Sequence, residues 1–370
     1  MNFDYTDDQK ALKDEARRFL ADVAPLACAR GVLDDPAQGH DAALWARIGE
    51  QGWCGAAIPE AYGGLGLGYV ELCALAEELG RAVAPVPFAS SVYQFAEALL
   101  VAGSEAQKAE WLPKVSTGEL IGTLAVTEGP GVLSLDSIAT RFENGTLTGT
   151  KLPVTDGMAA DRAVVLAREG LFLVDLTASG VSREMVSTLD PTRGAARITF
   201  DKAPAVPLAP GNALEQLSRI HDHAAILLAF EALGGADRAL EMARDYALER
   251  YAFGRPIGSY QAIKHKLADV FVRNEVARAN AYYGAWALAS DAPELGLAAA
   301  AARVSSSAAY YLAARENIQT HGGIGFTWEA DCHFFYRRAR HLSLIIGAPR
   351  VWKRHLADRL EQRLEAEETP

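Results

Sequence analysis

The sequence has few cysteines, and their arrangement argues against a metal-binding or disulfide-stabilised protein. Its 370 residues include only four, which are Cys28, Cys54, Cys73 and Cys332. No two of them form a CxxC pair, and no histidine lies at zinc-ligand spacing from any of them. We therefore expect reduced and mostly buried thiols, as in a cytosolic protein, and no metal site.

Long hydrophobic runs and an excess of positive charge are also missing. No apolar run reaches the roughly 18 residues that a membrane span requires. The N-terminal stretch is amphipathic and acidic and lacks the basic and apolar regions of a secretory signal. The formal net charge of -11 disfavours binding to nucleic acid or to an anionic membrane. These absences predict a cytoplasmic protein with no nucleic-acid or membrane partner.

What the sequence does contain is a change from helical to strand-like patterning and back. Residues 1–117 and 211–370 repeat apolar residues every three to four positions, which is typical of helices. Residues 118–210 consist of short β-branched segments broken by Gly, Asn and Asp, which is typical of strands and hairpins. The prediction is a multidomain α+β protein. It has an N-terminal helical domain, a central antiparallel and β-barrel-like domain, and a C-terminal four-helix bundle.

The C-terminal region includes an alanine-rich segment, "ELGLAAAAARVSSSAAYYLAA". Small side chains allow helices to pack closely, and this segment is apolar on more than one face. Either one face contacts another subunit, or the helix is buried within its own domain.

Two loops of this region carry residues that a simple helix connection does not need. "ERYAFGRPIGSYQ", Glu249 to Gln261, offers Arg250 and Arg255 for an anionic group and Phe253 for stacking on a flat ring. "QTHGGIGF", Gln319 to Phe326, has glycines that either cap a helix or bring backbone N–H groups to a phosphate. Taken alone, the first loop is equally compatible with a solvated charged loop, and the second favours a helix cap.

Taken together, the two loops resemble the signature segments of the acyl-CoA dehydrogenase family of flavoproteins. The stretches "ERYAFGRPIGSYQAIKHKLADV" and "QTHGGIGFTWEADCHFFYRRAR" carry the resemblance, and "PEAYGGLGLG" and "AVTE" match weaker family segments in the same order. The resemblance extends over nearly the whole chain, including its helix–strand–helix order. It implies a role in fatty acid or lipid catabolism.

The resemblance implies an FAD site shared between subunits of a tetramer. Arg250 and Phe253 would reach the FAD of a neighbouring subunit, with Gln261 nearby. Gln319, Gly322 and Gly323 would approach the pyrophosphate and adenosine side.

In the β region the match is looser. Thr127 fits the family pattern, and Ser134 stands near the position that meets the thioester or CoA. Thr155 would donate to the flavin. The family usually has a Trp-Ile-Thr run here, whose tryptophan covers the flavin ring. This chain has Pro153-Val154-Thr155 instead, so the tryptophan is lost.

A carboxylate is missing where the resemblance leads us to expect one. The family removes a proton from the α-carbon of an acyl-CoA thioester, generally with a glutamate, while a hydride passes from the β-carbon to flavin N5. The glutamate position after the second signature holds Ile346, next to Gly347. The alternative position, early in the first bundle helix, matches residues near His223, Ala224 and Ala225, and none of these is acidic.

Glu231 is the replacement base that the sequence suggests. It lies two helical turns after Ala224, in an apolar stretch with no local ion-pair partner. Burial would raise its pKa and suit it to proton abstraction. The alternative is a salt bridge between Glu231 and an arginine of another helix.

Two functional hypotheses follow, with a different reaction on the same scaffold, such as desulfination or oxygenation, as a third. In the first, the chain dehydrogenates an acyl-CoA and passes electrons to an electron-transfer flavoprotein. In the second, it is a non-catalytic or half-site subunit of a heteromeric complex. The assembly is accordingly a homotetramer or a heterotetramer with a paralogous subunit.

Overall fold

The computed structural model describes residues 5–130, 133 and 135–368, and it divides the chain into two compact units. The first unit consists of Met1–Ala27, Tyr69–Ala84 and Ala225–Pro370. The second consists of Cys28–Gly68 and Pro85–Ala224. Each unit therefore combines segments that are distant in sequence, and each is described separately below.

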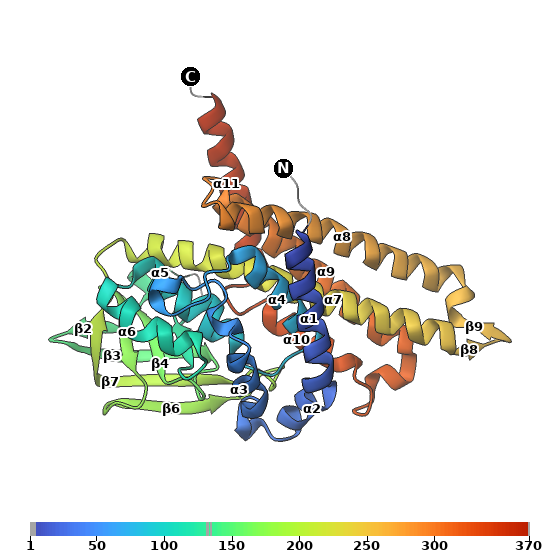
Figure 1. Cartoon of the computed structure of the whole chain (residues 1–370), viewed down its shortest axis with the longest axis horizontal. Helices are drawn as coiled ribbons and strands as arrows, with labels where there is room; N and C mark the ends of the chain where they lie inside the picture. Colours follow the sequence, from blue (N-terminus) through green and yellow to red (C-terminus); the bar gives the residue numbers. More distant parts are fainter. Residues whose placement is uncertain (1–4, 131–132, 134, 369–370) are drawn as a thin grey trace. The chain divides into compact units, whose positions relative to one another are not determined.

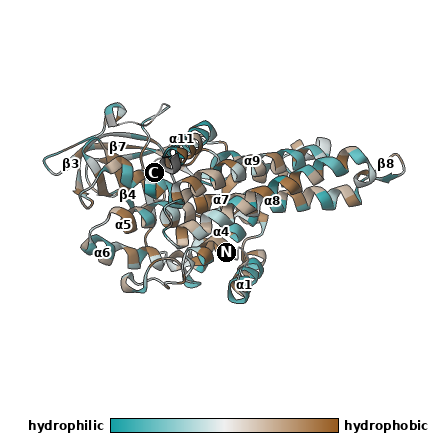
Figure 2. Ribbon diagram, turned by 90° about the horizontal axis from the view of Figure 1, so that it is seen from above, coloured by the Kyte–Doolittle hydropathy of each residue, from teal (hydrophilic) through white to brown (hydrophobic). Residues whose placement is uncertain are grey.

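The first unit is a helical assembly built around three long helices. Its helices are α1 (Asp7–Val23), α4 (Tyr69–Arg81), the later part of α7 (Ala213–Glu249), α8 (Gln261–Ala289), α9 (Leu295–His321), α10 (Cys332–Leu342) and α11 (Pro349–Glu368). Figure 2 shows α7, α8 and α9 running side by side. Helix α9 packs against α8, α10 and α11, and α1 packs against α4.

Helix α9 contains the alanine-rich segment, and its small residues are enclosed within the unit. Ala298, Ala299, Ala300 and Ala302 are all fully buried. This is the second alternative left open by the sequence. Helix α8 does carry apolar side chains that face outward, since Phe271, Val272 and Val276 are each more than half exposed.

The second unit joins short helices to a β-sheet. Its helices are α2 (Leu26–Asp34, which begins in the first unit), α3 (Ala42–Glu50), a π-helix (Ala89–Ala96), α5 (Glu97–Ala102), α6 (Glu105–Ser116) and the start of α7. Its strands are β1 (Gly122–Ala125), β2 (Arg141–Glu143), β3 (Thr146–Thr155), β4 (Arg162–Ala167), β5 (Gly170–Asp175), β6 (Val181–Val186) and β7 (Ala195–Pro207). The helix–strand–helix order expected from the sequence is confirmed.

The strands follow the order β1-β4-β5-β7-β3-β2, and β6 also pairs with β7. All of these pairs are antiparallel except β1 with β4, which is parallel, so the expected all-antiparallel sheet is corrected at one edge. After β1, the chain contacts β3 through a parallel bridge between Glu128 and Leu152. The chain that follows β1 thereby lies beside β3, whereas β1 itself pairs with β4.

Helices α7 and α8 are connected by a small hairpin of two short strands, β8 (Tyr251–Ala252) and β9 (Arg255–Pro256). The hairpin lies at the far end of this helix pair, as Figure 1 shows. Among the described residues, no helix combines the length and apolar character needed to cross a bilayer.

Candidate functional site

The β8–β9 hairpin presents an aromatic ring to its surroundings. Tyr251 pairs with Pro256 and Ala252 with Arg255, so Phe253 and Gly254 form a two-residue turn. Both turn residues have positive φ, 51° for Phe253 and 80° for Gly254. A left-handed conformation is uncommon for a bulky residue, and such strain is concentrated at functional sites. Phe253 is 97% exposed, so packing within its own chain does not explain its presence.

The base of the hairpin is fixed by contacts that leave Arg250 open to solvent. The backbone N–H of Ile257 donates to the carbonyl oxygen of Arg250 at 2.8 Å. The guanidinium of Arg255 lies 4.0 Å from the ring centre of Tyr260, whose hydroxyl donates to the Ala252 carbonyl. Arg255 is thus held against a ring, whereas the Arg250 side chain is exposed and available to an anionic group.

The second predicted loop lies beside the same part of α7. Helix α9 ends at His321, and Gly322 caps it with φ 63° and a backbone N–H directed to the Gln319 carbonyl. The capping role proposed from the sequence is therefore present. The His321 ring stacks on Tyr246 with centroids 4.2 Å apart, and Tyr246 lies one helical turn before Arg250. This contact places the second loop against the last turns of α7, which lead into the first loop.

The geometry of these loops fits a flavin dinucleotide. Added Cβ atoms at Gly322 and Gly323 would meet no atom within 4 Å, so the backbone is open to a ligand there. Gln319 is exposed beside them. Gln261 is the first residue of α8, whose N-terminus has no side-chain cap, and such an end favours negative charge. Arg250, Gln319 and the start of α8 could hold a pyrophosphate, whereas the backbone N–H of Gly322 is already used to cap α9.

The second unit holds the remaining predicted contacts. Thr155 ends β3 and is half-buried, and the Thr123 hydroxyl donates to its carbonyl oxygen at 2.7 Å. Thr127 is exposed, and its hydroxyl donates to the Pro153 carbonyl at 3.2 Å. Ser134, the predicted substrate contact, lies outside the described residues.

Glu128, next to Thr127, forms an ion pair that the sequence did not reveal. Lys151 is fully buried, and its Nζ lies 2.7 Å from Oε1 of Glu128. The same carboxylate accepts hydrogen bonds from Ala139 and Thr140. Burial alone would raise the pKa of Glu128, but these hydrogen bonds outweigh it and lower the pKa to about 2. The pair fixes the chain between β1 and β3.

The two usual base positions contain no carboxylate. Ile346 is buried, while Ala224 and Ala225 are fully enclosed. His223 is also buried, and its Nδ1 lies 2.8 Å from Oε2 of Glu97 at the start of α5. The sequence analysis did not identify Glu97 as a site residue. An acidic residue inside the apolar run "QFAEALL" could have indicated a buried carboxylate.

Glu231 is buried in the first unit, but it is not isolated. Its Oε1 lies 3.5 Å from Nη1 of Arg338 on α10. Burial lowers the pKa of the neighbouring Arg303 to about 9, and the negative charge of Glu231 opposes that shift. This arrangement corresponds to the salt bridge with another helix that the sequence left as an alternative.

The glycines that follow Glu231 also serve packing. A Cβ at Gly234 would lie 1.7 Å from the Glu77 carbonyl oxygen of α4, and one at Gly235 would collide with the Tyr310 ring. Helices α4 and α9 therefore approach α7 closely at these two glycines.

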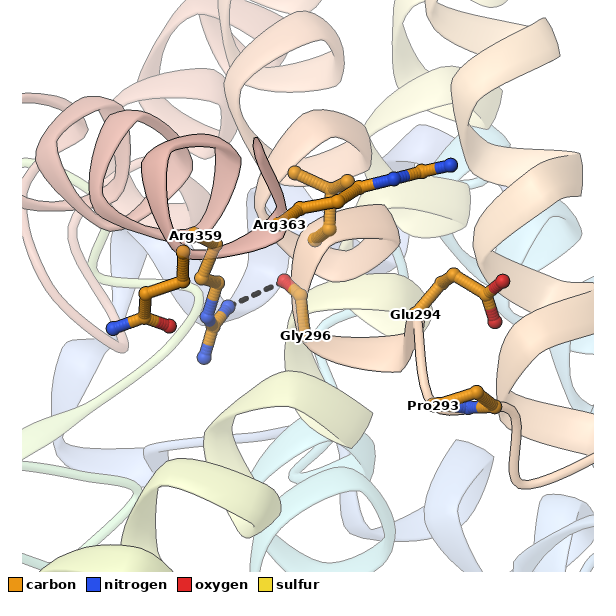
Figure 3. A pocket seen from close by; sticks show the side chains of 7 residues that line it. Pro293, Glu294, Gly296, Arg359 and Arg363 are labelled. Carbon is orange, nitrogen blue, oxygen red and sulfur yellow. Dashed lines mark hydrogen bonds between the residues drawn. The ribbon is translucent and has the colours of Figure 1, made fainter. Parts of the chain in front are cut away.

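A separate pocket of about 550 Å³ lies between the start of α9 and α11. Figure 3 shows Arg359 and Arg363 reaching over it, with Arg359 donating to the Gly296 carbonyl. None of the predicted site residues lines this pocket.

Comparison with known proteins accords with this architecture. Residues 6–119 match the acyl-CoA dehydrogenase N-terminal domain, and residues 215–361 match the acyl-CoA dehydrogenase C-terminal domain. Acyl-CoA dehydrogenase IpdE2 of Mycobacterium tuberculosis is 34% identical over 351 residues, which cover 95% of this chain and 96% of that protein.

Solved structures show the same similarity. The Tcur3481–Tcur3483 steroid ACAD, solved as a variant, is 31% identical, with a TM-score of 0.88 over 97% of this chain and 99% of that one. The ChsE4–ChsE5 complex of Mycobacterium tuberculosis is 26% identical, with a TM-score of 0.89 over the whole of both chains.

The fold and the two loops thus define a flavoprotein of the oxidoreductase class. The chain belongs to the acyl-CoA dehydrogenase family. Members of this family use FAD to oxidise a CH–CH bond of an acyl-CoA thioester.

Proposed function

We propose that this chain catalyses the α,β-dehydrogenation of an acyl-CoA thioester with FAD and passes the electrons to an electron-transfer flavoprotein. When bound, FAD accepts the hydride that leaves the β-carbon. The observation that carries the proposal is Phe253, a strained and almost fully exposed aromatic residue at the tip of a hairpin. The adjoining Arg250 and the open glycines of the second loop suit the same ligand.

The FAD site is proposed to be shared between subunits of a tetramer. Arg250, Phe253 and Gln261 would come from one subunit, and Thr127 and Thr155 from another. The nearly complete exposure of Phe253 supports this division, since a stacking ring needs a partner outside its own hairpin. The apolar residues exposed on α8 support subunit association.

The alternative function, a half-site or non-catalytic subunit of a heterotetramer, is favoured by one observation. Ile346 occupies the usual base position, and a branched alkyl side chain cannot accept a proton. The ChsE4–ChsE5 structure is a complex of two named components. A paralogous subunit would then supply the missing carboxylate.

The acyl group is proposed to be bulky. Small alanine, glycine and serine residues are frequent in the chain and would leave space, and one structural neighbour is named as a steroid ACAD. A panel of thioesters with short, long and steroid-ring acyl groups would test the size preference.

Purification tests the proposals directly. A yellow homotetramer that loses its visible flavin absorbance anaerobically with an acyl-CoA supports an active enzyme. A chain that is insoluble alone, and yellow and active only with a co-expressed paralogue, supports the heteromeric alternative. A colourless monomer that does not retain added FAD would refute the shared flavin site.

A further inference from the structure

Glu97 and His223 form a buried pair in the second unit. Only 1% of Glu97 and 5% of His223 are exposed. Glu97 directly follows the π-helix Ala89–Ala96. Long π-helical segments are rare, and π-turns occur frequently at functional sites. Placing a carboxylate and an imidazole together inside an apolar region is costly unless the two groups support each other.

Hydrogen bonds connect the π-helix to the strand that carries a predicted flavin contact. Ser90 donates to the carboxylate of Asp156 at 2.7 Å, and Asp156 directly follows Thr155. On strand β1, the N–H of Gly122 donates to the Ser91 hydroxyl at 3.1 Å. The segment that leads into Glu97 and the residue predicted to meet the flavin are therefore fixed to each other within one unit.

The arrangement of the pair leaves Nε2 of His223 as the atom that would accept a proton from the substrate. The Nδ1 atom of His223 lies 2.8 Å from Oε2 of Glu97, and in the tautomer that carries its proton on Nδ1 the imidazole donates to this carboxylate. In this tautomer the lone pair that can accept a proton is on Nε2. The carboxylate also stabilises the imidazolium that forms when Nε2 is protonated, as in other carboxylate–histidine arrangements.

We propose that His223 is the base that removes the α-proton of the acyl-CoA, and that Glu97 positions it. This inference rests on the proposed dehydrogenation. The Nε2 atom takes the α-proton, the electrons of that C–H bond become the Cα=Cβ bond, and the hydride would leave the β-carbon for bound FAD, which would serve as the oxidant. His223 ends as an imidazolium paired with the Glu97 carboxylate, so protons, electrons and charge balance. Imidazole is the side chain that most often serves as a general base.

With His223 as the base, the reaction does not need a glutamate at either usual position. His223 occupies the alternative base position on the first bundle helix, where the resemblance led us to expect a carboxylate. The acidic partner is supplied from α5 instead, and histidine carries the proton between it and the substrate. Glu231 is then not the base, and its carboxylate pairs with Arg338 at 3.5 Å.

The test isolates proton removal from hydride transfer. The probes are analogues of butyryl-CoA, octanoyl-CoA, palmitoyl-CoA and a steroid-ring acyl-CoA in which sulfur replaces the β-carbon, so that no hydride can leave. Deuterium uptake from heavy water at the α-carbon is followed by mass spectrometry. The variants are His223→Gln and Glu97→Gln, and the matched control is His221→Gln on the same helix. Flavin content, melting temperature and analogue Kd are measured for every variant.

We expect His223→Gln to slow α-exchange by about 100-fold or more, the usual contribution of a general base. Glu97→Gln slows it by about tenfold or more because the imidazole loses its anionic partner. Flavin content and Kd stay close to the wild-type values in both, and His221→Gln exchanges normally. A His223→Gln protein that exchanges at the wild-type rate would overturn the assignment.

The same proteins distinguish this failure from failure of the proposed function. If the wild type bleaches its flavin with an acyl-CoA and His223→Gln does so equally fast, dehydrogenation stands and His223 is not the base. If the wild type binds the analogues but shows neither exchange nor bleaching with the matching thioesters, both proposals are overturned.

Discussion

The guanidinium of Arg338 lies 3.5 Å from the carboxylate of Glu231, and both side chains are buried in the helical unit. Arg338 also donates to the backbone carbonyl of Ala84. The pair therefore connects α7 to α10, and Arg338 also connects α10 to the chain just after α4. We propose that this contact stabilises the bundle, because removing either charge would leave the other buried without this partner.

Glu231→Gln should consequently affect stability more than chemistry. Removing one member of a buried ion pair leaves Arg338 without its counter-charge, which costs about 3 kcal/mol or more. Denaturant unfolding should show this loss, whereas Glu215→Gln on the exposed start of α7 should show little change. Flavin bleaching per folded holoenzyme should remain within a few-fold of wild type. A fully stable variant that has lost bleaching would instead identify Glu231 as the base.

Arg250→Ala should lower the flavin content of the purified protein. Its exposed guanidinium is proposed to bind a phosphate or ribose of FAD, and a charge-assisted hydrogen bond contributes about 1.5–3 kcal/mol. The expected result is a rise in FAD Kd of about tenfold or more, measured by fluorescence titration. Arg244→Ala, which removes another exposed arginine of α7, is the control. Equal flavin retention by the two variants would count against the shared site.

Phe253→Gly should separate stability from flavin binding. Glycine adopts positive φ without the steric cost that phenylalanine bears, so the flavin-free protein should be as stable as wild type or more stable by about 1 kcal/mol. FAD affinity should fall because the stacking ring is lost. Met185→Ala controls for removing an exposed apolar side chain elsewhere. Unchanged FAD affinity in Phe253→Gly would show that the ring serves another partner.

Acid should weaken the second unit through Glu128. Its folded-state pKa of about 2 lies below the unfolded value of roughly 4.3. The stabilisation is therefore fully present above about pH 4.3 and is lost as the pH falls toward 2. Glu128→Gln should lower stability at neutral pH and reduce the decline between about pH 4.5 and 2, as measured by denaturant midpoints. Identical pH profiles for variant and wild type would contradict this role.

Sequence periodicity was sufficient to predict the helices because their apolar positions repeat regularly. Helix α8, for example, forms over Gln261–Ala289, within the region 211–370 in which apolar residues repeat every three to four positions. The order of helical, strand and helical regions followed in the same way. The parallel pairing of β1 with β4 was not predictable, because pairing direction depends on contacts between segments about 40 residues apart.

Contacts between side chains that are distant in the sequence could not be predicted either. Glu97 and His223 are 126 residues apart, and Glu231 and Arg338 are 107 apart, so no local spacing connects them. The sequence correctly identified Glu231 as an unusual carboxylate in an apolar helix, but only the fold supplied its cation. The two flavin loops were recognisable because each carries its distinctive residues within one short stretch.

Anaerobic titration of the purified holoprotein with the panel of acyl-CoA thioesters tests the central claim most directly. The account predicts that at least one thioester bleaches the oxidised flavin and yields the corresponding α,β-unsaturated product in a one-to-one ratio. A flavin that stays oxidised with every bound thioester, with and without a co-expressed paralogous subunit, would contradict the assignment as an acyl-CoA dehydrogenase.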